Sequence, residues 1–281
     1  MKPQFLHVAT SSFVLWFDKW LLHKGEAYTN YTNQKLYYLE DERLPSFVTY
    51  SSAFKQWVRD SSIPGATVPD DVMVNGSALG RGLQDMKIDY DNGRVIMNTN
   101  VGTSRDILTD FAVKDFNIYI TNQEEEELIT ESKFDVNSRF FNSEKAIPPY
   151  TQVLPAIFIN CKQLENQPFS FGGEDSTTLQ FRCVVMADEV YKLDGALSIF
   201  ADARETCFFE IPYNEYPVSE YGDNKFGIYN YDDFASNRED KYYVTEVVTS
   251  KMSDRLNKKV LPNLFIGFID IDVVKYRMPR A

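Results

Sequence analysis

The chain has 281 residues, and its 41 Asp and Glu outnumber its 29 Lys and Arg, which gives a formal net charge of −12. Nucleic acid and anionic membranes are bound by clustered Lys and Arg, so this balance argues against both kinds of partner. Aromatic residues make up 15% of the chain, with 17 Tyr and 21 Phe, and such residues favour strands. The sequence therefore predicts a strand-rich α+β protein without sequence-specific binding to nucleic acid.

Residues 13–22 are dense in Trp, Phe and Leu, which fits either a buried strand with a turn or a short helix. Tyr28, Tyr31 and Tyr37 follow among Thr and Asn. Tyrosines in a polar setting indicate a loop or an edge strand with an adhesive surface. A small core beneath a long loop is the alternative.

The next stretch contains turn signals between short strands. Residues 53–58 fit a helical turn, while Asn75-Gly76 and Asn92-Gly93 predict tight hairpins. Phe111–Ile120 is expected to form one strand, with Phe116 and Ile118 on the same face as Ile120.

A change of composition near residue 122 suggests a domain boundary. The acidic run at residues 124–127 fits a solvated helix start or a linker better than a metal-binding loop. We therefore expect a mostly-β domain over residues 1–125, a linker over 126–149 and an α+β domain over 150–281, in which a sheet carries an amphipathic helix.

The stretch Thr177–Ile211 predicts a strand, a helix and a strand. Its apolar residues alternate first and then recur every three or four positions. These residues are Leu179, Phe181, Cys183, Val185, Val190, Leu193, Leu197 and Phe200. We expect Asp188 to cap the helix and Arg204 to lie in its last turn.

Two later segments are candidates for contact with other molecules. Pro212–Asp240 is longer than an ordinary connection and carries Tyr221, Tyr229 and Tyr231, so we expect an interaction arm. Leu264–Arg277 predicts the last and longest strand, and we expect it or the arm to pair with a neighbouring copy.

Reactive side chains are sparse. Two His and no G-x-S-x-G motif argue against a serine or cysteine hydrolase. Cys161, Cys183 and Cys207 are too few and too far apart for a disulfide framework or a zinc site, so we expect Cys183 and Cys207 to be buried free thiols in a reducing cytosol.

Two pairs of carboxylates are the main enzymatic alternative. Asp89 and Asp91 flank Tyr90, and Asp270 and Asp272 flank Ile271, so each pair could hold a cation or divide acid and base roles. The same spacing is typical of a turn and of the wet face of a strand. We therefore assign no catalytic, metal-binding or cofactor-binding residue.

Several strings resemble those of neck and tail proteins of tailed-bacteriophage virions. They are LWFDKWLLHKGEAYTN, QWVRDSSIPGA, VNGSALGRGLQDMKIDYDNGRVIM, FAVKDFNIYITNQEEE, LPAIFIN, QPFSFGGEDSTTLQFRCVVMAD and YKLDGALSIF. The C-terminal half is similar in layout to tail-terminator and head–tail connector proteins. The resemblance implies a ring-forming adaptor or terminator in the virion, assembled in the host cytoplasm.

We therefore expect a non-enzymatic subunit that contacts copies of itself and other neck and tail proteins. The expected interface residues are Tyr28, Tyr31, Tyr37, Tyr221, Tyr229, Tyr231, Phe268, Asp270 and Asp272. Alternatives are a β-protein that binds or hydrolyses carbohydrate and an attachment module of a tail fibre or baseplate.

Overall fold

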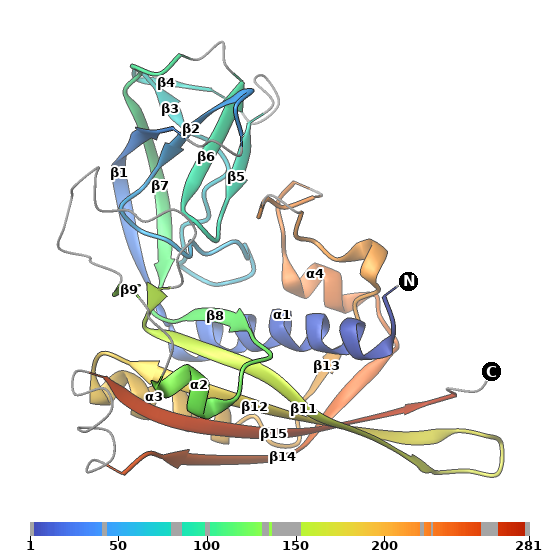
Figure 1. Cartoon of the computed structure of the whole chain (residues 1–281). Helices are drawn as coiled ribbons and strands as arrows, with labels where there is room; N and C mark the ends of the chain where they lie inside the picture. The colour runs from blue at the N-terminus through green and yellow to red at the C-terminus, as the bar shows by residue number, and fades with distance from the viewer. Residues whose placement is uncertain are drawn as a thin grey trace.

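The described residues form a seven-stranded and a six-stranded β-sheet, a separate two-stranded pair, and helices that pack on the six-stranded sheet (Figure 1). The computed structural model describes residues 3–40, 44–79, 86–98, 102–130, 135–136, 153–219, 222–225, 227–253 and 264–278. Strands account for 44% of it and helices for 21%, which confirms the expected strand-rich α+β class. No helix in these ranges has the length and apolar character needed to cross a membrane.

The seven-stranded sheet has the order β4-β3-β7-β1-β2-β6-β5. Its strands are β1 (Tyr28–Leu39), β2 (Phe47–Ser51), β3 (Met73–Val74), β4 (Ser77–Ala78), β5 (Lys87–Asp89), β6 (Arg94–Asn98) and β7 (Ile107–Lys114). Its core contains Trp57 stacked on Phe111, with ring centroids 4.4 Å apart. The hairpin at Asn75-Gly76 is confirmed: it joins β3 to β4, and both residues have the positive φ of a type I′ turn.

The six-stranded sheet has the order β13-β14-β15-β12-β11-β8. Its strands are β8 (Asn117–Ile120), β11 (Ala156–Pro168), β12 (Asp175–Ala187), β13 (Cys207–Phe209), β14 (Lys241–Lys251) and β15 (Phe265–Arg277). Cys183 pairs with Ile269, and Phe181 pairs with Ile271. The buried faces of β12 and β15 therefore line up, as alternation in each strand predicts. β9 (Asp135–Val136) and β10 (Val153–Leu154) form a separate parallel pair.

Helices α1 (Phe5–Gly25) and α3 (Val190–Ala201) cover one face of the six-stranded sheet. In α1, Phe13 and Phe17 are four residues apart and share a side of the helix. The Phe13 ring stacks on Phe181 of β12, with centroids 3.8 Å apart, and the Phe17 ring stacks on Phe200 of α3 at 3.9 Å. The first apolar segment is therefore a helix, and its aromatic side belongs to the core.

The seven-stranded sheet is inserted between α1 and β8. The chain leaves the helix at Gly25 and returns to the six-stranded sheet at Asn117. The two connections lie side by side, because the N–H of Asp115 donates a hydrogen bond to the carbonyl oxygen of Ala27, at 2.8 Å. Both α1 and β8 precede residue 126, and most of residues 126–149 lie outside the described residues, so the expected three-part division stays a prediction.

The described part of residues 212–240 packs against α1 and beside the seven-stranded sheet. It contains a 3-10 turn (Tyr213–Glu215) and helix α4 (Tyr231–Ser236). The N–H of Ser61 donates to the carbonyl oxygen of Tyr229 at 2.9 Å. Tyr229 and Tyr231 are only 3% and 4% exposed, so these two candidate interface residues lie in the interior.

The expected edge position of β15 is wrong, because β15 lies between β14 and β12. β1 lies between β7 and β2, but β2 pairs with it only at Tyr37–Leu39, so Tyr28 and Tyr31 have a described strand partner on one side only. Both sides of β15 are used within the chain, since its residues pair with β12 along its whole length and with β14 over most of it. Leu264–Arg277 therefore offers no free edge to another copy.

Three local expectations are also wrong. Residues 53–58 form no helix, because their backbone bonds to the sheet instead: the N–H of Val58 donates to the carbonyl oxygen of Ala112 at 2.8 Å. Phe111–Ile120 is two strands, β7 and β8, in different sheets. Cys207 is exposed, whereas Cys183 is buried as expected.

The ends of α3 differ from the expectation as well. Glu189, not Asp188, occupies the N-cap position, and its side chain makes no capping hydrogen bond. Asp188 instead accepts a hydrogen bond from Lys192 Nζ at 2.9 Å. The helix ends at Ala201, so Arg204 lies beyond its last turn.

Replacing Phe13 with Ala should lower the free energy of unfolding by about 3–5 kcal/mol, because it removes a fully buried ring and leaves a cavity against Phe181. Denaturant unfolding measures this loss as a lower midpoint. Leu6→Ala on the same helix is the matched control: Leu6 is 43% exposed, so its replacement should cost far less. Equal losses in the two variants would contradict this account of the core.

Candidate interaction surface

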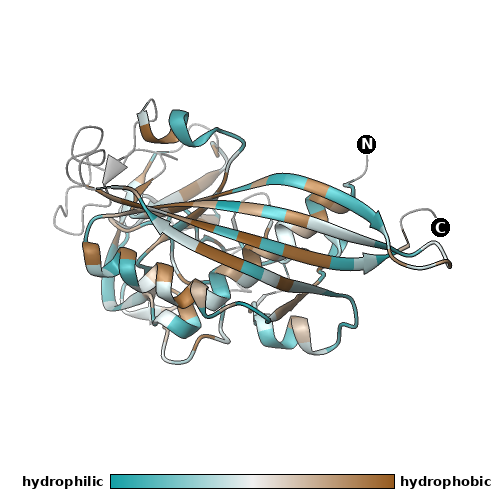
Figure 2. Cartoon of the chain, turned by 90° about the horizontal axis from the view of Figure 1, so that it is seen from below, coloured by the Kyte–Doolittle hydropathy of each residue, from teal (hydrophilic) through white to brown (hydrophobic). Residues whose placement is uncertain are grey.

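The face of the six-stranded sheet opposite α1 and α3 is here called the open face, because the described residues cover it only at the end where α2 and Leu154 pack. Figure 2 shows the long strands side by side with alternating hydrophilic and hydrophobic bands. Strand alternation sends Ile269 and Ile271 to the helices and sends Asp270 and Asp272 to the open face. Its residues are Thr178, Gln180, Arg182, Tyr243, Glu246, Val248, Phe268, Asp270, Asp272, Val274 and Tyr276.

One end of the open face is covered by helix α2 (Glu125–Thr130). Leu128 and Ile129 of this helix pack with Phe158, Val184 and Ile266 of the sheet. For the acidic run a helix start or a linker is expected, and the structure shows the helix start. Three Glu occupy the first turn of α2, where the helix dipole favours negative charge. This placement brings Glu125 over the middle of the sheet.

Arg182 is the central charge of the open face. Its Nε donates to Glu125 Oε1 at 2.7 Å, and its Nη1 donates to Asp270. Its guanidinium lies 4.4 Å from the ring centroid of Phe268, a cation–π distance. Burial alone would lower the pKa of Arg182, but the contacts with Glu125 and Asp270 outweigh it and raise the pKa.

Acidic side chains crowd the next row of the sheet. Asp272 of β15 pairs directly with Glu246 of β14, and like charges in opposed positions repel. Partial burial, followed by repulsion from Glu246 and Asp270, raises the pKa of Asp272. A depression of about 330 Å³ lies beside these groups. It is lined by Glu125, Lys162, Gln180, Phe181, Arg182, Asp270 and Asp272.

The sheet also carries exposed aromatic side chains at its far end. Figure 1 shows the hairpin of β11 and β12 projecting beyond the body of the protein. Phe171 at its tip is fully exposed, and Phe169 is 59% exposed. The Phe169 ring lies 4.6 Å from Tyr276 of β15, and Tyr276 lies 6.4 Å from Tyr243 of β14. Exposed aromatic groups of this kind mark contact surfaces.

The structure brings together three of the nine expected interface residues, Phe268, Asp270 and Asp272. Tyr28, Tyr31 and Tyr37 lie on β1 in the other sheet, where Tyr31 stacks on Phe54 at 4.5 Å.

The expected tyrosine surface on β1 is thus partly a core contact. Tyr28 donates from its hydroxyl to the carbonyl oxygen of Pro64 at 2.6 Å. Tyr221 lies outside the described residues.

Arg182, Glu125, Phe169 and Phe171 are additions that the sequence analysis did not single out. Glu125 belongs to the acidic run, and both Phe residues lie in a glycine-bearing loop. The glycines mark the loop in the local sequence. The contact between Glu125 and Arg182 of β12 joins residues that are 57 positions apart, so no local pattern predicts it.

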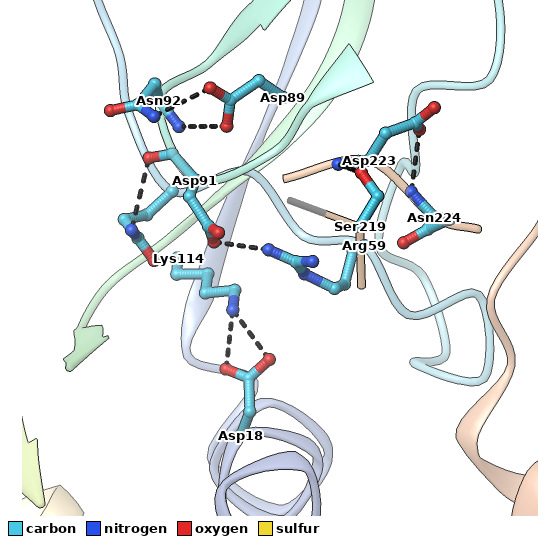
Figure 3. Close-up of polar contacts among 10 residues, drawn as sticks. Asp18, Arg59, Asp89, Asp91, Asn92, Lys114, Ser219, Asp223 and Asn224 are labelled. Carbon is cyan, nitrogen blue, oxygen red and sulfur yellow. Dashed lines mark hydrogen bonds and ion pairs between the residues drawn. The ribbon is translucent and has the colours of Figure 1, made fainter. Parts of the chain in front are cut away.

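The carboxylate pair Asp89 and Asp91 is engaged in internal contacts (Figure 3). Asp89 accepts hydrogen bonds from the backbone and side chain of Asn92, at 3.0 and 2.8 Å, while Asp91 forms an ion pair with Arg59. Burial, followed by the charge of Asp91, raises the pKa of Asp89. These contacts are typical of a structural turn.

Figure 3 also shows the polar junction between the two sheets. Lys114 of β7 donates to both oxygens of Asp18 of α1, at 2.8 and 2.7 Å, with both side chains largely buried. Attraction to Asp91 outweighs the effect of burial and raises the pKa of Arg59.

Within the described ranges, no group of three or more His, Cys, Asp or Glu could hold a metal ion.

Replacing Asp272 with Asn should raise the free energy of unfolding at pH 7 by about 0.2–1 kcal/mol, because it relieves the opposed pair with Glu246. The folded-state pKa of Asp272 is raised, so the wild-type penalty is present at neutral pH and fades as pH falls through that pKa. Denaturant unfolding across this range should show the two proteins converging in acid.

Glu246→Gln is the reciprocal test. It should give a similar gain at pH 7, and the double variant should gain no more than either single one, because both remove the same repulsion. A loss of stability in Asp272→Asn at pH 7 would contradict the account of repulsion between Asp272 and Glu246.

Neither a comparison with models of protein families nor one with curated proteins finds a match for this chain.

Proposed function

We propose that this protein is a non-enzymatic structural subunit of a phage virion, which forms an oligomeric ring in the neck or tail and joins the head or connector to the tail. The observation that carries the proposal is a sheet with one face packed by two helices, while the described residues cover only one end of the other face. An aromatic, projecting hairpin extends the same sheet. The virion location rests on the resemblance of the quoted strings.

The open face has the composition of a contact surface. Tyr243, Tyr276 and Val248 are 46%, 44% and 49% exposed, and they surround the charged row of Asp272 and Glu246. Aromatic and Arg side chains are enriched at the centres of interfaces, whereas isolated apolar residues on a surface need no partner. Here the apolar side chains are grouped on one sheet, which favours an association role.

The internal pairing of the charged groups supports a passive role. Arg182 binds Glu125 and Asp270, and Asp91 binds Arg59, so these groups serve as structural contacts in this chain. A ring adaptor acts through packed surfaces alone. Repeated head-to-tail contacts form a closed ring when the rotations between successive copies add up to a full turn. Its partners are then further copies and the adjoining neck and tail proteins.

The oligomeric state of the purified full-length chain tests this proposal. Mass photometry and electron microscopy should show a ring of defined size, and mass spectrometry of purified virions should detect the chain. A protein that stays monomeric at high concentration and is absent from virions would overturn the proposal.

Replacing Phe169 and Phe171 together with Ala should weaken association by about tenfold or more, because aromatic anchors carry a large share of interface energy. The measurement is the concentration at which the oligomer dissociates. Tyr191→Ala is the matched control: Tyr191 is 69% exposed on α3, away from the open face. Equal weakening by the control would assign the effect to general loss of surface aromatics.

A further inference from the structure

Two strands of the six-stranded sheet have long free edges. β8 pairs with β11 at Ala156–Ile159, and residues 121–124 continue beside it with contacts to Ile159, Asn160 and Lys162. The outer edge of β11 has no strand partner or such contact from Gln163 to Pro168 among the described residues. β13 pairs with β14 only at residues 241–243, and the outer edge of β14 from Thr245 to Lys251 likewise has no described strand partner. Each free stretch is about as long as an ordinary strand of five to six residues.

The directions of the strands make these two edges compatible. β14 is antiparallel to β15, β15 to β12, and β12 to β11. Three reversals leave β14 and β11 running in opposite directions. A second copy in the same orientation, placed beside the first, therefore presents its β14 antiparallel to the β11 of the first copy. The free part of β14 is level with Ile157–Gln163 of β11, so the second copy is shifted along the strands toward the hairpin end, past β8. Antiparallel pairing keeps its hydrogen bonds perpendicular to the strands and continues the sheet without a change of type.

The side chains at both edges favour a continued sheet. On the helix side of β11, Cys161 is partly buried and Leu164 is 37% exposed. On the same side of β14, Val247 is partly buried against the core. On the open face, Val248 is 49% exposed. A neighbouring strand would cover apolar groups that the single chain covers only in part.

Each edge also contains a bulge, at Cys161–Gln163 in β11 and at Val244–Glu246 in β14. Bulges increase the twist of a strand, and they are one of the means by which natural edges avoid indiscriminate pairing. The bulges therefore limit which strands can pair with these two edges.

We propose that the free edge of β11 in one copy pairs antiparallel with the free edge of β14 in the next, so that the six-stranded sheets join into one continuous sheet around the assembly. This inference rests on the proposed self-association and specifies its contact. The contact is head-to-tail, because each copy contributes a different edge, and it leaves the open face on one side of the joined sheet.

Cysteine cross-linking between two differently labelled populations tests the contact. The background carries Cys161→Ser and Cys207→Ser, and its oligomer size is measured first. One population carries Gln163→Cys, which lies on the open face of β11. The other carries Glu246→Cys, Val248→Cys or Ser250→Cys, which lie on the same face of β14. Tyr191→Cys on α3 is the exposed control.

A disulfide needs Cβ atoms about 3.8 Å apart, so one of the three β14 positions should cross-link strongly to Gln163→Cys after mixing, subunit exchange and oxidation. The other two positions and the Tyr191→Cys control should give much less. Cross-linking within a single population, β11 to β11 or β14 to β14, would overturn the inference.

An oligomer of the expected size that gives no mixed cross-link at any of the three positions would also overturn the inference, yet leave the proposed assembly role intact. A background chain that is monomeric, like the wild type, would remove both the assembly role and this contact. The size measurement made before oxidation distinguishes these two failures.

Discussion

The packing of α1 on the six-stranded sheet is the contact on which the rest of the structure depends. Phe13 and Phe17 bring the first helix against β12 and α3, at ring distances of 3.8 and 3.9 Å. Stacked aromatic pairs add favourable geometry to a large buried area. This contact buries one face of the sheet in the main core. The opposite face carries polar and charged side chains, and the described residues cover it only where α2 packs.

The same helix also sets the position of the seven-stranded sheet. Lys114 reaches Asp18 across the junction, and both groups are largely buried, so removal of either would leave an unpaired charge. The N–H of Tyr231 donates a hydrogen bond to Asp60 Oδ1 at 3.0 Å, which attaches helix α4 to the segment that follows β2. The two sheets therefore meet through directional polar contacts, in contrast to the aromatic packing beneath α1.

Local patterns in the sequence predicted the parts of the fold that depend on neighbouring residues. Alternation in Leu179–Val185 and in Ile269–Val273 gave the correct buried faces, since strand geometry alone decides them. Strand order failed, because the interior position of β15 depends on partners far away in the chain. Residues 53–58 show the same conflict: their local pattern fits a helix, but hydrogen bonds to β7 and to the β5–β6 turn prevail. Of the candidate surface, the aspartates were visible in the sequence, while Arg182 became significant only when the fold placed Glu125 and Phe268 beside it.

The insertion of the seven-stranded sheet after α1 has a consequence for the order of folding. The first helix must find β12, which lies well over a hundred residues later, and such distant contacts slow folding because chain entropy is lost before they form. The hydrogen bond between Asp115 and Ala27 brings the two ends of the insertion together. Once the inserted sheet has formed, the loop that must close between the helix and β12 is shortened by the length of the insertion, which lowers its entropic cost modestly. We therefore expect early completion of the inserted sheet to favour the docking of the N-terminal helix.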